Sequence, residues 1–181
     1  LEEQTLSRKL VLPIHRGRIW KIVPDDWEPR ETPKLSTFTD LALVELLSSP
    51  DGWYRDMAQR LLVERDEKES IQPLINLALN GESALGRFHA LWTLEGLNSL
   101  NSKMLLRLIN DPEPQVATTA LRLLEPFAAQ DKDLRRTLQE FLLKDREIVP
   151  VEVLQMAFIA EVFEPAASHE LLLRIATRYD T

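Results

Sequence analysis

Three stretches of the chain decide its fold: YRDMAQRLL at residues 54–62, GRFHALWTL at residues 86–94 and VATTALRLL at residues 116–124. Each stretch has apolar residues at three- and four-residue intervals, which predicts an amphipathic helix. Each also contains an alanine that is followed four residues later by a leucine. The alanines are Ala58, Ala90 and Ala120, at intervals of 32 and 30 residues. Repetition at such a period is typical of helical repeat proteins, whose units bury their apolar faces by stacking.

A looser fourth copy, VLQMAFI, occupies residues 153–159, where Ala157 lies 37 residues after Ala120. An amphipathic segment precedes each of the four stretches, and a last one at residues 169–179 follows them. The apolar residues of the four preceding segments are Leu41, Val44, Leu47, Ile71, Leu74, Ile75, Ala78, Leu105, Leu108, Ile109, Leu134, Leu138, Phe141 and Leu142. The sequence therefore predicts an all-α fold, a right-handed α-α superhelix of four to five helix pairs.

Two similar turns indicate where helices begin. Ser49-Pro50-Asp51 and Asp111-Pro112-Glu113 each offer an N-cap oxygen, a proline for the first helical position and an acid for the first turn. We therefore expect a helix to start within a residue or two of each proline. Gly96, after the second stretch, is interpreted as a helix C-cap.

The first 37 residues differ from the rest of the chain. Residues 1–23 contain two apolar runs rich in β-branched and aromatic residues, which predicts a strand or hairpin. Residues 24–37 contain three prolines and six charged residues without periodicity, which predicts a linker. The helical pattern starts at Phe38, so residues 38–181 are the predicted repeat domain.

Composition argues against several classes of function. Residues 38–181 contain 15 Lys/Arg and 23 Asp/Glu, a charge of -8 that repels a phosphate backbone, so nucleic acid is not an expected partner. The absence of cysteine excludes disulfides, thiolate metal sites and covalent haem attachment. No apolar run reaches the roughly 18 residues that a membrane span requires, so membrane insertion is not expected.

Because Leu1 is preceded by no Met and followed by no signal stretch, we interpret the chain as a piece of a longer protein.

The turn and helix at residues 111–120, DPEPQVATTA, resemble the turn and inner helix of HEAT repeats, which carry an arginine three residues before the alanine. Arg55 and Arg87 stand at that position, whereas Ala117 and Leu154 depart from it. The resemblance implies a ladder of arginines that is broken in the second half of the domain.

A wider resemblance covers nearly the whole chain. Residues 15–22 resemble the closing strand of a sugar-dehydrogenase-type β-propeller, and residues 47–55 and 86–97 resemble the helical region that follows it in large multidomain proteins of planctomycetes and related bacteria. That family has a propeller, then HEAT repeats, then a c-type haem domain, in an exported protein often described as a membrane-bound dehydrogenase. The resemblance implies that residues 1–23 end a preceding propeller and that the protein is periplasmic or on the cell surface. The chain itself contains neither the propeller body nor a haem motif.

The histidines and paired carboxylates form no catalytic or metal-binding pattern. His15, His89 and His169 stand in three different segments, so a local two-histidine metal site cannot form. Asp25-Asp26 and Asp131/Asp133 fall in the predicted linker or at a helix start, where solvation and capping account for them. We therefore expect no catalytic residue, no metal and no cofactor in this chain.

Six residues are candidates for an interaction surface: Arg55, Arg60, Arg87, His89, Trp92 and Arg122. The arginines stand on predicted inner helices at repeat-equivalent positions, which would place them along one surface. The alternative is that they cap neighbouring helices or pair with acids across repeats. His89 either contacts a partner or bonds a neighbouring side chain, and Trp92 either belongs to an aromatic shelf or packs between repeats.

The sequence thus predicts a non-catalytic structural and protein-interaction module that spaces or docks domains. Its partners would be neighbouring domains of the same chain or another protein. Two alternatives stay open: a regulatory module that binds a partner protein or peptide, and an accessory domain of a sugar dehydrogenase-like exported enzyme. An exposed apolar patch along the inner helices would favour the first of these.

Overall fold

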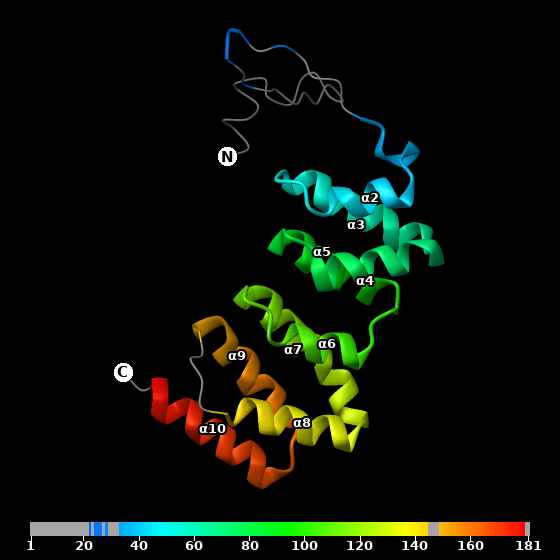
Figure 1. Ribbon diagram of the computed structural model, residues 1–181. Coiled ribbons are helices and arrows are strands. Elements are labelled where there is room, and N and C mark those ends of the chain that lie inside the picture. The colour runs from blue at the N-terminus through cyan, green and yellow to red at the C-terminus, as the bar shows by residue number, and fades with distance from the viewer. Residues whose placement is uncertain (1–21, 23, 27, 29–32, 145–148, 180–181) are drawn as a thin grey trace, which may run out of the picture. The chain divides into compact units, whose positions relative to one another are not determined.

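The computed structural model describes residues 22, 24–26, 28, 33–144 and 149–179 (Figure 1). The chain divides into two units, Leu1–Pro33 and Lys34–Thr181. The β segment predicted at residues 1–23 lies outside the described residues except for Ile22. The end of the predicted linker belongs to the second unit, because Leu35–Thr37 forms a 3-10 helix whose Leu35 is buried in the core.

The second unit is all-helical over its described residues, with nine α-helices and no strand. The helices are α2 (Asp40–Leu46), α3 (Gly52–Arg65), α4 (Ile71–Asn80), α5 (Ala84–Gly96), α6 (Ser102–Leu108), α7 (Pro114–Gln130), α8 (Lys132–Leu142), α9 (Pro150–Ile159) and α10 (Pro165–Tyr179). Further 3-10 helices are η2 (Lys68–Ser70) and η3 (Ala160–Val162), the second of which extends α9. The predicted all-α class is confirmed.

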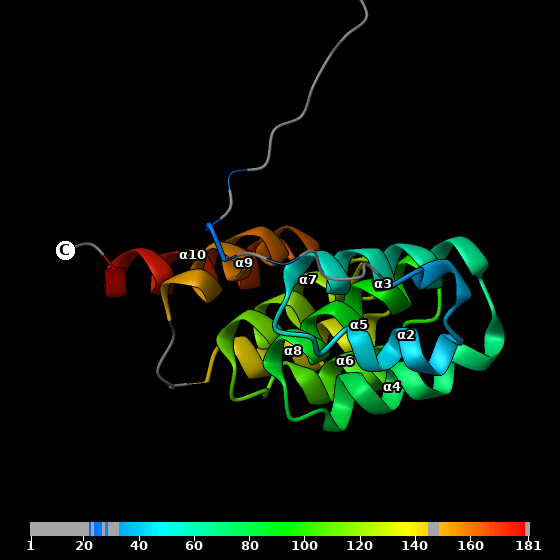
Figure 2. The same cartoon turned by 90° about the horizontal axis from the view of Figure 1, so that it is seen from above.

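The helices of the second unit lie in two layers (Figures 1 and 2). In one layer α3, α5, α7 and α9 each contact the next, and in the other α2 contacts α4 and α4 contacts α6. Across the layers α2 packs on α3, α4 on α5 and α6 on α7, so three helix pairs repeat one arrangement. The expected fourth pair differs, because α8 packs on α7 while α9 packs mainly on α7 and α10.

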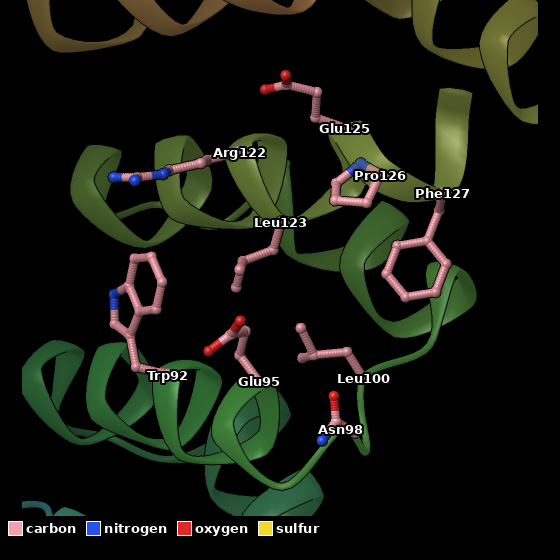
Figure 3. A pocket seen from close by; sticks show the side chains of 9 residues that line it. All are labelled: Trp92, Glu95, Asn98, Leu100, Arg122, Leu123, Glu125, Pro126 and Phe127. Carbon is pink, nitrogen blue, oxygen red and sulfur yellow. The ribbon is translucent and has the colours of Figure 1, made fainter. Parts of the chain in front are cut away.

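Pro126 stands inside α7, where this regular pairing ends. A proline within a helix removes one backbone hydrogen bond and crowds the preceding turn. The ribbon of α7 changes direction at Pro126 (Figure 3). The helix that follows, α8, packs on α7.

Side-chain caps and prolines fix the helix starts. Residues that cap a helix by accepting a backbone N–H are Thr39, Asp51, Ser83, Asn101 and Asp131. α3 and α7 begin two residues after Pro50 and Pro112, within the expected interval. The expected capping residues were wrong, however, because Asp51 rather than Ser49 caps α3, and Pro114 rather than Pro112 opens α7.

The two layers meet over a core of leucine and alanine. The repeated alanines Ala58, Ala90 and Ala120 are fully buried, and each permits a neighbouring helix to approach closely. The fourth copy is shifted by one residue, because Met156 is buried where Ala157 was expected, and Ala157 is only half-buried. One apolar stripe packs against the core and sets the register of α9. It consists of Met156, Ile159 and Ala160.

Gly96 serves packing rather than capping. It is the last residue of α5, and a Cβ at this position would lie 2.9 Å from Cγ2 of Val63 on α3. The left-handed residue after the helix is Asn98, with φ of 50°, and Ser99 N donates to Leu94 O at 2.8 Å. This is the hydrogen bond of a Schellman cap, and asparagine tolerates the left-handed conformation that it needs. The C-cap expected at Gly96 was therefore wrong.

Candidate interaction groove

Three cavities lie between successive helices of the α3, α5, α7 and α9 layer. Their volumes are about 450 Å³ between α3 and α5, about 640 Å³ between α5 and α7, and about 320 Å³ between α7 and α9. Trp92 and Glu95 line both the first and the second cavity, and Arg122 and Glu125 line both the second and the third. Neighbouring cavities share wall residues, so the three cavities adjoin one another across four helices, and we call this row of cavities the inner groove.

Two rows of side chains border the inner groove, and both follow from the repeat. On each of the four helices one buried residue marks the equivalent position of the repeat, and the positions of the other residues are counted from it. These buried residues are Ala58, Ala90, Ala120 and Met156. The residues two positions later are Arg60, Trp92, Arg122 and Phe158, and those five positions later are Val63, Glu95, Glu125 and Glu161. Residues three apart share a helix face, so each helix supplies one member to each row.

The largest cavity, between α5 and α7, has apolar walls (Figure 3). Leu100, Leu123, Pro126 and Phe127 line it together with the ring of Trp92. The Trp92 side chain extends from α5 toward α7, and the guanidinium carbon of Arg122 lies 5.4 Å from its ring centroid. This cation–π contact fixes both side chains at one end of the cavity. Aliphatic and aromatic side chains are therefore accessible beside charged ones.

The charge of the inner groove is negative. Its ionisable residues are Asp56, Arg60, Glu64, Glu95, Arg122, Glu125 and Glu161, five carboxylates against two guanidinium groups. Arg60 and Glu64 form a salt bridge of 2.6 Å, and the hydrogen bond and charge of Glu64 raise the pKa of Arg60.

Asp56 forms no salt bridge or side-chain hydrogen bond with the described residues, and neither do the three carboxylates at the repeated offset of five residues, Glu95, Glu125 and Glu161. We call these three the carboxylate row. The unpaired charge of the inner groove is thus anionic.

Arg55 and Arg87 do not line the inner groove. Their Nη1 atoms donate to Ser49 O at 2.6 Å and to Gly81 O at 2.8 Å, in each case a carbonyl six residues earlier. Arg87 also donates from Nε and Nη2 to the two carboxylate oxygens of Asp111, and the two side chains are 11% and 5% exposed. Both arginines therefore hold the turn before their own helix and contact the next repeat, as the capping and pairing alternative describes.

His89 lies between α3 and α5 with both ring nitrogens bonded. Its Nε2 accepts from Arg55 Nε at 3.2 Å, so the ring proton is on Nδ1, which donates to Gln59 Oε1 at 2.8 Å. Burial, and secondly the charge of Arg55, lower the pKa of His89, while Asp56 acts in the opposite direction. The imidazole is a neutral bridge between helices.

Of the six candidate residues, Arg60, Trp92 and Arg122 lie in the inner groove and Arg55, Arg87 and His89 lie between repeats. Sequence reasoning missed the carboxylate row and the aromatic Phe127 and Phe158. The fixed offset of five residues from the repeated alanines would have identified Glu95 and Glu125. Glu161 was hidden because the expected register of the fourth copy was one residue too late.

The remaining chemical possibilities are limited over the part of the chain that the structure describes. No three His, Asp or Glu side chains gather there as a group able to hold a metal ion. Asp131 Oδ1 accepts from the backbone N–H groups of Asp133 and Leu134 as the cap of α8. No helix among the described residues combines the length and apolar character needed to cross a membrane.

Comparisons of the chain with protein-family models, curated proteins and solved structures gave no match.

Proposed function

We propose that this chain is a non-catalytic docking module, a right-handed α-solenoid of HEAT type that holds a protein segment in the inner groove. The segment belongs either to a neighbouring domain of the same polypeptide or to a partner protein. The similar spacing of the repeated alanines and the two-layer stacking support the solenoid, because each helix pair covers the apolar face of the next.

The observation that carries the proposal is the row of adjoining cavities across α3, α5, α7 and α9. The cavities adjoin across three helix boundaries, an arrangement that suits an elongated protein segment. Its apolar centre and charged border are the composition of a protein-recognition surface. Trp92 and Phe158 supply the aromatic contacts in which such surfaces are rich.

Interrepeat contacts support a spacing role alongside docking. Arg55 reaches His89 in the next repeat, and Arg87 reaches Asp111 in the turn before α7. Each contact fixes one helix pair to its successor, so the module would keep the arrangement of its helices while a segment binds. A rigid groove reduces the entropy lost on binding.

The resemblance of residues 15–22, 47–55 and 86–97 adds a proposal for the parent protein. In that proposal the module follows a β-propeller and precedes a haem domain in an exported, dehydrogenase-like protein. The chemistry of such a protein would reside in its other domains, and this module would position them.

Site-specific photocrosslinking tests the docking function. A benzophenone amino acid replaces Phe158, which is 55% exposed in the inner groove, in the full-length protein within its own cells. The matched control replaces Leu41, which is 59% exposed on α2. We expect Phe158 to cross-link to a defined protein segment that mass spectrometry identifies, and Leu41 to give no such product. No cross-link from Phe158, or the same product from both positions, would overturn the docking function.

A further inference from the structure

We infer that the segment held in the inner groove is a polyproline-type extended chain that carries lysine or arginine at every third residue. This inference rests on the proposed function and adds the chemical class and conformation of the bound segment. Three observations carry it: the sign of the unpaired charge, the spacing of that charge, and the apolar cavity beside it.

The charge of the groove selects a basic segment. Arg60 is paired with Glu64, and Arg122 lies against the Trp92 ring, so both guanidinium groups already have partners. The carboxylate row has none among the described residues. A cationic side chain would therefore gain an ion pair at each carboxylate without breaking an existing one. An acidic segment would meet three uncompensated like charges, and such juxtaposition opposes binding.

The spacing of the carboxylate row selects an extended conformation. Glu95, Glu125 and Glu161 stand at equivalent positions on α5, on α7 and in the turn extending α9, so they follow one another at the distance between packed helices. That distance is about 8 to 10 Å. A polyproline chain advances about 3.1 Å per residue, so three residues span about 9 Å. Polyproline geometry has three residues per turn, which also places every third side chain on one face.

A helical segment fits this spacing less simply. An α-helix advances about 1.5 Å per residue, so matching cations would have to stand six or seven residues apart. The extended segment reaches the whole carboxylate row with only seven residues, counted from the first cation to the third, since they are i, i+3 and i+6.

The central cavity receives an apolar residue of the segment. Between Glu95 and Glu125 the groove opens into the cavity of about 640 Å³ that Leu100, Leu123 and Phe127 line. A residue between two cations of the segment would direct an aliphatic side chain there and remove apolar surface from water. The expected motif therefore begins with a lysine or arginine, continues with two residues of which one is apolar, and ends with another lysine or arginine.

Binding of designed peptides to the purified chain tests the inference. The probe is a fluorescein-labelled peptide made of three arginine–proline–leucine repeats, and its control has the same composition with the three arginines, three prolines and three leucines in separate blocks. Fluorescence anisotropy should show the repeat peptide binding about tenfold more tightly than the block peptide, because only its cations match the row. Salt should weaken its binding, since the carboxylates are near solvent.

A triple variant tests whether the carboxylate row is responsible. Glu95→Gln, Glu125→Gln and Glu161→Gln together should weaken binding of the repeat peptide about tenfold. Its matched control changes three exposed acids elsewhere, Glu45→Gln, Glu82→Gln and Glu170→Gln, and should bind as the unmodified chain does. Circular dichroism would check that both variants remain folded.

The results separate this inference from the docking function. Equal binding of both peptides, no binding of the repeat peptide, or equal losses in both triple variants would overturn the inference. A cross-link from Phe158 to a segment without regularly spaced cations would overturn it too, while leaving the docking function intact. The docking function fails when Phe158 gives no cross-link or the same product as Leu41.

Discussion

The guanidinium group of Arg87 on α5 faces the carboxylate of Asp111 in the turn before α7, and two nitrogen–oxygen pairs of 2.8 Å join them. Asp111 also accepts from the backbone N–H of Glu113 at 2.9 Å, and Arg87 also donates to Gly81 O. The Arg87 side chain thus connects the turn before α5 with the turn before α7. Both partners are nearly buried, so each depends on the other for neutralisation.

Replacing Arg87 by alanine should lower the free energy of unfolding by about 3 to 5 kcal/mol, because the Asp111 carboxylate would stay buried without its counter-charge. Arg87→Lys should cost less, since it keeps the charge and loses the paired geometry. The matched control is Arg136→Ala, which removes an exposed salt bridge to Glu140 in which the arginine side chain is 81% exposed. Urea denaturation would measure all three. Arg87→Ala and Arg136→Ala with equal midpoints would contradict the structural role of Arg87.

His89 should make stability depend on pH. Burial and Arg55 lower its pKa in the folded chain, so the unfolded chain binds the proton first as the pH falls. Its contribution to stability is therefore fully present above the ordinary pKa of about 6.5 and is lost as the pH falls through the lower folded value.

Thermal melts between about pH 8 and pH 5 test this dependence, since the window spans the ordinary histidine pKa. The melting temperature of the unmodified chain should fall more steeply toward acid than that of His89→Gln, which cannot take up the proton. His169→Gln, at an exposed position on α10, serves as the control and should follow the unmodified chain. Parallel curves for the unmodified chain and His89→Gln would refute the prediction.

The repeated alanines should not tolerate larger side chains. Ala58→Leu, Ala90→Leu and Ala120→Leu should each lower the free energy of unfolding by about 1 to 3 kcal/mol, because added methylenes at a fully buried contact force the helices apart. Ala129→Leu, at an exposed position of α7, is the control and should have little effect. Denaturant melts that leave all three core variants as stable as the control would mean that the repeat alignment is incorrect.

Gly96 and Val63 should be energetically coupled. Gly96→Ala alone should destabilise the fold, since the new Cβ would stand 2.9 Å from Val63 Cγ2 and the β-branched valine cannot turn aside cheaply. In a Val63→Ala background the clash is gone, and the same change should stabilise by up to about 1 kcal/mol through helix propensity. A double-mutant cycle measures the coupling, and a zero coupling energy would disprove the contact.

The sequence by itself determined the helices and the repeat. Ala58, Ala90 and Ala120 are buried as their common spacing predicts, because a small residue recurring on one helix face requires a close neighbour. The start of α3 was predictable within two residues although Asp51 rather than Ser49 caps it, because both residues offer a side-chain oxygen in the same turn. The right-handed superhelix, the N-terminal β segment and the family resemblance remain predictions.

Only the tertiary structure decided which of these residues meet. Arg87 and Asp111 are 24 positions apart and pair only when α5 and α7 are stacked, and Trp92 meets Arg122 for the same reason. The register of α9 depends on which of its apolar stripes packs against α7. The local pattern therefore could not show that Met156 rather than Ala157 is the buried residue. The inner groove likewise exists only between helices. The physical reason is that periodicity fixes the faces of one helix, whereas the alignment of faces from different helices is set by packing energy over the whole stack.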